Sequence, residues 1–63
     1  MRIDRIKLVT ELAKRDLTAK RLAELSGLSR STVSNVKAGK SCTDDVGLKI
    51  AGALGVDVAE ILE

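Results

Sequence analysis

The chain has 63 residues and a formal net charge of +2, with no histidine, no aromatic residue, no proline and one cysteine. A chain of this length forms one small domain packed from aliphatic side chains, and a lone cysteine excludes an internal disulfide. Because unpaired bases stack on aromatic side chains, the composition disfavours single-stranded RNA or DNA as a ligand, and nothing in it indicates a metal or another cofactor.

No stretch of the chain resembles a signal peptide or a membrane span. The longest uncharged run late in the chain, Ile50 to Val56, has seven residues and includes two glycines, which is far too short to cross a bilayer. We therefore expect a cytoplasmic protein with no membrane partner and no evident small-molecule ligand.

Apolar residues recur at helical spacing and no alternating strand pattern occurs, so the sequence predicts an all-α fold, a compact domain of five helices. The first helix is expected over roughly Ile3 to Arg15. Its apolar residues are Ile6, Val9 and Ala13 on one stripe, with Leu8 and Leu12 beside it. Asp16 is expected to end this helix, because aspartate tolerates a left-handed turn better than most residues.

The second and third helices are each expected to begin at a hydroxyl cap and to end at a glycine. Thr18 is the predicted N-cap of a helix over Ala19 to Ser26, and Gly27 can adopt the positive φ that ends it sharply. Ser29 is the predicted cap of the third helix, which runs to Ala38 and ends at the next glycine.

The fourth helix is expected to open at Thr43, with two aspartates in its first turn where the helix dipole favours anions, and to close at Gly55. Residues 57–60 resemble a capping box for a short last helix. Gly47 and Gly52 lie inside the fourth helix, where each costs about 1 kcal/mol relative to alanine. Close approach of a neighbouring helix and simple tolerance in a weak helix both explain them.

Basic residues gather between Thr18 and Ser41, a segment with five of the 11 basic side chains and one of the nine acidic ones. A surface of this sign attracts an anionic partner such as nucleic acid. The alternative is a solvated surface without a partner.

One face of the third predicted helix has small polar side chains and no bulky apolar group. At about 100° per residue, this face consists of Arg30, Ser31, Ser34, Asn35 and Ala38. Arginine can donate two parallel hydrogen bonds to guanine, and asparagine can both donate to and accept from adenine. We therefore expect base contacts from Arg30 and Asn35, with Ser31 as a permissive third contact.

Contacts to the DNA backbone are expected on both sides of that helix. The start of the second helix offers free amides and a hydroxyl to one phosphate, and the start of the fourth offers a second such site. The predicted backbone contacts are Thr18, Lys20, Ser29, Ser34, Lys37, Lys40, Ser41 and Thr43.

Several short motifs stand at a spacing typical of one known family. The motifs are Leu17-Thr18, Leu22-Ala23, Gly27 to Ser34, Gly39-Lys40 and Ala53 to Val56. In these positions the chain resembles the Cro and phage-repressor helix-turn-helix family, also called the XRE family. The resemblance covers nearly the whole chain. It implies one five-helix domain over residues 1–63, a helix-turn-helix at about 18–38, and a recognition helix at about Ser29 to Ala38 in the major groove.

We therefore expect a sequence-specific, double-stranded DNA-binding transcription regulator of bacterial or phage type, acting as a homodimer on DNA. Its dimer surface is expected near the C-terminal end, although docking of these residues on the core is an equal alternative. The residues concerned are Val56, Val58, Ile61 and Leu62.

A second hypothesis is an antitoxin-like or accessory protein-interaction module, in which the same scaffold binds a protein through its C-terminal apolar residues. An enzyme is disfavoured, because the chain lacks histidine, paired carboxylates in an apolar setting and a phosphate-cradling glycine loop.

Overall fold

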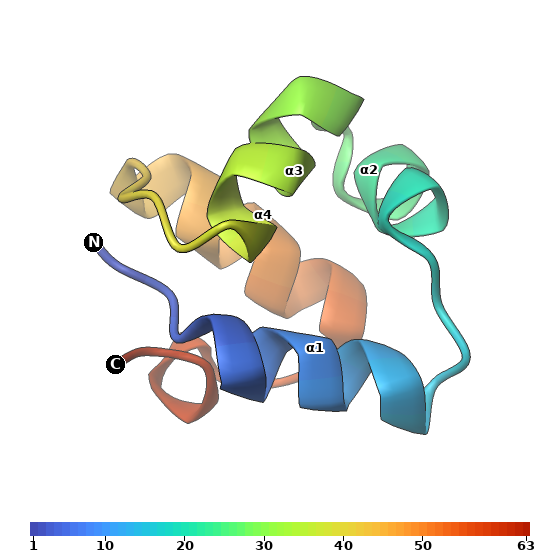
Figure 1. The fold of residues 1–63 in the computed structure, drawn as a ribbon, viewed down its shortest axis with the longest axis horizontal. Coiled ribbons are helices and arrows are strands. Elements are labelled where there is room, and N and C mark those ends of the chain that lie inside the picture. The colour runs from blue at the N-terminus through green and yellow to red at the C-terminus, as the bar shows by residue number, and fades with distance from the viewer.

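The computed structural model describes residues 1–63 and contains four α-helices, a single turn of 3₁₀-helix and no strand (Figure 1). The elements are α1 (Arg5–Lys14), α2 (Ala19–Ser26), α3 (Arg30–Lys37), α4 (Asp44–Leu54) and η1 (Val58–Glu60). In Figure 1, α3 and α2 lie at one edge of the molecule, α1 lies at the opposite edge, and α4 runs behind them. No helix has the length and apolar character needed to cross a membrane.

The all-α prediction is confirmed, but the prediction of five helices is wrong, because the expected last helix is only the 3₁₀ turn η1. The predicted capping box of residues 57–60 is present at its start. Helical geometry ends at Ile61, whose carbonyl accepts a hydrogen bond from the Asp4 N–H at 2.8 Å. The next residue, Leu62, forms an antiparallel bridge with Ile3. These backbone groups pair with the start of the chain and so cannot extend a helix.

The predicted starts of α2, α3 and α4 are confirmed by their caps. The hydroxyl groups of Thr18, Ser29 and Thr43 each accept a hydrogen bond from the backbone N–H three residues later, at 3.1, 3.1 and 3.2 Å. Gly27 has a φ of 72° and ends α2 in the left-handed region, so the chain turns directly into α3. Asp16 has a φ of 52°, as predicted for the residue that ends α1.

α1 starts two residues later than expected, with Asp4 as its N-cap. The Asp4 carboxylate accepts hydrogen bonds from the backbone N–H groups of Ile6 and Lys7 at 2.8 and 3.0 Å. The Lys7 N–H is the largest cause of a pKa for Asp4 below its ordinary value. The cap also satisfies two of the donors that a helix start leaves free.

Of the two groups of apolar residues predicted on α1, only one faces the core. Leu8 and Leu12 are buried, whereas Ile6 is 66% and Val9 46% exposed, and Ala13 is exposed as well. The two leucines lie about 120° around the helix from the group of Ile6, Val9 and Ala13, so a helix this short cannot bury both groups. The core therefore receives Leu8 and Leu12, and the stripe of Ile6, Val9 and Ala13 stays at the surface.

A single cluster of 11 buried side chains holds the elements together. It consists of Ile3, Leu8, Leu12, Leu22, Ala23, Val33, Val36, Ile50, Ala51, Leu54 and Ile61. Every α-helix contributes to it, and both terminal segments add one isoleucine each. α2 packs on both α3 and α4, which fixes the helix-turn-helix on the rest of the domain.

The two glycines inside α4 have different environments. A methyl group at Gly47 would meet the thioether of Met1, so this glycine makes room for the N-terminal side chain. Apart from the adjoining backbone of its own helix, nothing lies within 4 Å of the same position at Gly52, which is exposed. Close approach thus explains Gly47, whereas Gly52 is merely tolerated.

Gly52→Ala is expected to stabilise the domain by about 0.5–1 kcal/mol, because alanine loses less backbone entropy than glycine on entering a helix. Urea unfolding followed by circular dichroism measures this as a higher midpoint with an unchanged slope. Gly47→Ala is the matched control in the same helix, and its gain should be smaller because Met1 must move. An unchanged or lower unfolding midpoint for Gly52→Ala would contradict the conclusion that Gly52 is merely tolerated in α4.

Candidate nucleic-acid interface

α3 buries one side and exposes the other, in the orientation that its pattern predicts. Val33 and Val36 are 0% and 1% exposed and pack in the core. Arg30 and Asn35 are both exposed on the opposite side. The remaining exposed residues of that face are Ser31, Ser34 and Ala38. The outward face of α3, defined by these five residues, is not covered by any other part of the chain.

The polar side chains on the outward face of α3 form no hydrogen bond and no ion pair within the protein. The backbone carbonyl of Asn35 accepts from the Lys40 N–H at 3.1 Å, but its side-chain amide has no partner. The Arg30 guanidinium is equally unpaired. Each group therefore keeps its full set of donors or acceptors for a ligand.

Only some of the cations of the domain have a carboxylate partner. At the C-terminal end of α1, Lys14 and Arg15 both pair with Glu11 at 3.0 Å. These hydrogen bonds hold the pKa of Glu11 below its ordinary value, and the bond from Lys14 is the larger cause. In the helix-turn-helix, Arg21 pairs with Glu24 at 3.3 Å. The cations of this segment without a carboxylate partner are Lys20, Arg30, Lys37 and Lys40. Positive charge therefore remains uncompensated around α2 and α3.

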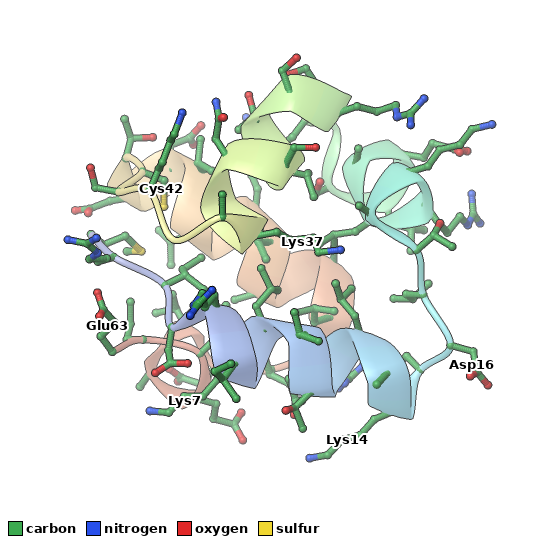
Figure 2. The ribbon with its side chains drawn as sticks, viewed as in Figure 1. Lys7, Lys14, Asp16, Lys37, Cys42 and Glu63 are labelled. Carbon is green, nitrogen blue, oxygen red and sulfur yellow. The ribbon has the colours of Figure 1, made fainter.

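The residues predicted to contact the DNA backbone lie at the start of α2, on α3 and its N-cap, and in the loop between α3 and α4. Those exposed in the structure are Thr18, Lys20, Ser29, Ser34, Lys40, Ser41 and Thr43. Lys37 is half-buried instead, and Figure 2 shows its side chain running from α3 in the direction of α2. Ser29 is engaged internally, because its hydroxyl also pairs with that of Thr32 at 2.8 Å.

The loop between α3 and α4 is held in place by the start of the chain, a contact that the sequence did not reveal. The Met1 ammonium group donates to the Cys42 carbonyl at 2.7 Å, and the Cys42 N–H donates to the Met1 carbonyl at 2.9 Å. Both bonds are between main-chain groups, so no residue pattern announces them. They anchor residues 40–43, which include three of the predicted phosphate contacts.

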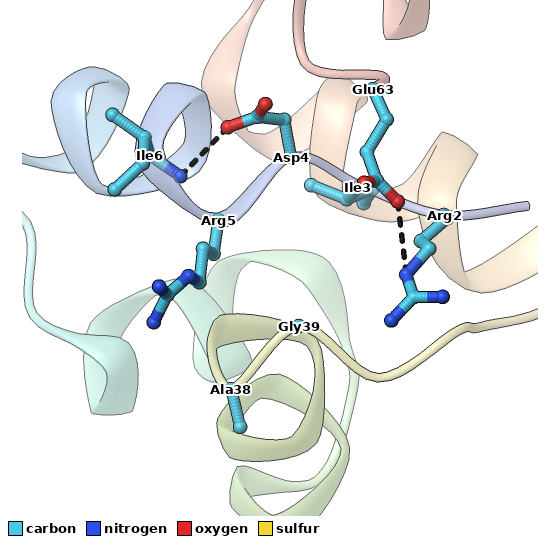
Figure 3. A pocket seen from close by; sticks show the side chains of 8 residues that line it. All are labelled: Arg2, Ile3, Asp4, Arg5, Ile6, Ala38, Gly39 and Glu63. Carbon is cyan, nitrogen blue, oxygen red and sulfur yellow. Dashed lines mark hydrogen bonds and ion pairs between the residues drawn. The ribbon is translucent and has the colours of Figure 1, made fainter.

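One cavity of about 260 Å³ lies at the end of α3, where the start of α1 approaches it (Figure 3). Arg2 pairs there with Glu63 at 2.9 Å, and the Asp4 carboxylate is turned toward the start of α1. Arg5 lies against Gly39 and has no ion pair. Two arginines and two carboxylates line the cavity, so it offers no net charge to a ligand.

The residues expected to form a C-terminal dimer surface pack against the core instead. Ile61 is completely buried, so it is not available to a partner. Val56, Val58 and Leu62 are half-buried and pack on the same core cluster. The structure thus favours the alternative in which these residues dock the end of the chain on the domain.

The family model described as Cro/C1-type HTH DNA-binding domain matches residues 7–63. No curated protein matches the chain. Two solved structures match it, "Native PhpD with Cadmium Atoms" and "Phpd with cadmium complexed with hydroethylphosphonate (HEP)", each with a TM-score of 0.85 and 27% identity over 100% of this chain. The chain spans 14% of the length of each of those two chains.

Proposed function

The chain belongs to the family of Cro/C1-type HTH DNA-binding domains, and on that premise we propose that it is a sequence-specific, double-stranded DNA-binding transcription regulator of bacterial or phage type. One observation supports this most directly: Arg30 and Asn35 stand exposed on the same face of α3 without a partner inside the protein. We assign the domain no catalytic activity and no cofactor.

In the proposed complex, α3 lies in the major groove with its outward face against the base edges. Arg30 donates two hydrogen bonds to O6 and N7 of a guanine, and Asn35 pairs with N6 and N7 of an adenine. The two residues are five positions apart, which is about 7.5 Å along the helix axis. Since successive bases on a strand are about 3.4 Å apart, they contact bases about two steps apart. The Ser31 hydroxyl adds one hydrogen bond, as donor or as acceptor.

Contacts to phosphates on both sides of the groove fix the position of α3. The free amides and the Thr18 hydroxyl at the start of α2 bind one phosphate, with Lys20 beside them. Lys40 and the start of α4 at Thr43 bind a second phosphate. These contacts give affinity without sequence preference, because every nucleotide has the same phosphate.

Lys40→Ala is expected to weaken binding to all duplex sequences by a similar factor and to reduce the slope of log affinity against log salt by about one unit. The measurement is a titration of fluorescent duplex DNA at several salt concentrations between about 50 and 200 mM. Lys14→Ala is the control, because Lys14 is equally cationic but pairs with Glu11 on α1.

A DNA affinity that does not fall steeply with salt would overturn the proposed function. The antitoxin-like or accessory protein-interaction module is the remaining alternative in that case. No contact in the structure favours it at present, because the C-terminal apolar residues on which it depended are packed on the core.

A further inference from the structure

α1 exposes three apolar side chains on one side, although it buries two leucines on another. Ile6 is 66% and Val9 46% exposed, and Ala13 is exposed as well. They are spaced by three and four residues and therefore share one face, here named the α1 apolar face. We propose that the α1 apolar face binds the same face of a second copy of this chain, with the two α1 helices antiparallel.

The sizes of these side chains fit an antiparallel pair. When such a pair is centred between Val9 and Thr10, Ile6 lies opposite the partner's Ala13, and Val9 lies close to the partner's Val9 and Thr10. A large side chain then faces a small one at both ends of the contact, as interdigitating helix surfaces require. A parallel pair would instead place Ile6 against the partner's Ile6 and Ala13 against the partner's Ala13, which leaves a gap at one end.

Charges at the two ends of α1 support the same orientation. Arg5 stands at the start of the helix, and Asp16, labelled in Figure 2, lies just beyond its end. Neither forms an ion pair within the chain. In an antiparallel pair centred between Val9 and Thr10, Arg5 and the partner's Asp16 are offset by two residues, which is about 3 Å along the helix axis. Each end thus gains a pair of opposite charges, whereas a parallel pair would oppose like charges.

The direction of the α1 apolar face also suits a DNA-binding pair, and this step rests on the proposed function. In Figure 2, Lys7 and Lys14 point from α1 away from α3, and Ala13 lies about 100° around the helix from Lys14. The apolar face therefore points sideways, roughly at right angles to the direction of α3. A two-fold axis that relates two antiparallel α1 helices then leaves both α3 helices on one side of the pair, where a duplex with two half-sites can meet both.

The proposed contact between the two α1 helices is small, so its test requires a high protein concentration. α1 has 10 residues and is about 15 Å long. A pair of helices of this length buries less than the roughly 1,200–2,000 Å² typical of stable complexes. We therefore expect a weak dimer that forms at high protein concentration and on DNA with two half-sites.

Disulfide trapping without DNA tests the orientation directly. In a Cys42→Ser background, chains bearing I6C are mixed with chains bearing A13C at about 1 mM and oxidised slowly. The antiparallel pair brings these two positions within the roughly 4.4–6.8 Å between Cα atoms that a disulfide requires. We expect the mixed disulfide between I6C and A13C chains and little product from either chain alone.

Leu48 provides the matched control, because it is 56% exposed on α4 and lies outside the α1 apolar face. L48C chains should yield no more disulfide than random collision gives. If the mixed disulfide between I6C and A13C chains forms only at that background level, the proposal is overturned and the α1 apolar face binds a different partner. Predominant I6C homodimers would also overturn it, in favour of a parallel pair.

Sedimentation equilibrium, which needs no introduced cysteine, gives a second, independent measurement of the dimer. The wild-type protein and Leu48→Glu should show the same concentration-dependent dimer, whereas Ile6→Glu should remain monomeric with an unchanged circular dichroism spectrum. On DNA, Ile6→Glu should keep its affinity for a single half-site and lose cooperative binding to two. If wild type and Ile6→Glu behave alike in both assays, the interface is wrong. Failure of the proposed function would show instead as lost salt dependence of single half-site binding.

Discussion

Arg30→Ala should weaken binding to the cognate duplex by about 1–3 kcal/mol and relax the choice of base at one position of the site. The Arg30 guanidinium is exposed and unpaired, so its removal changes no contact inside the domain. The loss therefore falls on the complex alone. Selection of duplexes from a random pool, followed by titration of the selected sequence and of single-base variants, measures both parts of the effect.

Arg30→Lys separates geometry from charge at the same position. Lysine keeps the positive charge but lacks the planar fork that donates two parallel bonds to guanine. We expect Arg30→Lys to keep the salt dependence of the wild-type protein while losing much of its base preference. If Arg30→Ala left both affinity and base preference intact, the outward face of α3 would not be the surface that contacts bases.

Ile61→Ala should cost about 2–5 kcal/mol of folding free energy, because a completely buried side chain is truncated and a cavity remains. The total free energy of unfolding for 63 residues is about 3–9 kcal/mol. A large fraction of the variant should therefore be unfolded at ambient temperature. Chemical unfolding followed by circular dichroism, with added osmolyte where the variant is too unstable, gives the difference.

Ile6→Ala is the matched control for this truncation, since it removes the same atoms from an exposed position on α1. Its cost should stay below about 0.5 kcal/mol at concentrations where the protein is monomeric. Equal losses for the two variants would mean that the end of the chain is not part of the core.

The starts and turns of α2, α3 and α4 could be predicted from the sequence because each has a local chemical cause. Thr18, Ser29 and Thr43 cap through hydrogen bonds to a backbone group three residues away. Gly27 ends α2 through its own φ. The outward face of α3 was equally predictable, because its valines lie on one side and its polar residues on the other.

The errors arose where two segments compete for the same part of the core. The apolar residues of α1 spread over nearly half of its circumference, so periodicity alone could not decide that Leu8 and Leu12 face inward while Ile6 faces out. The burial of Ile61 depends on the bridge between Ile3 and Leu62, which joins the two ends of the chain. Contacts of such large sequence separation leave no mark in local patterns, so the sequence predicted a fifth helix where the chain forms the turn η1 and pairs with its own start.

The pairing of the chain ends has a topological consequence. The Glu63 N–H donates to the Arg2 carbonyl at 3.2 Å, so a short linker can join the termini without reorganising the domain. Closing so short a loop costs little entropy. The fold is therefore suited to circular permutation, with new ends opened at the exposed Asp16 turn. For the same reason it can be inserted as an intact unit into a surface loop of a host protein.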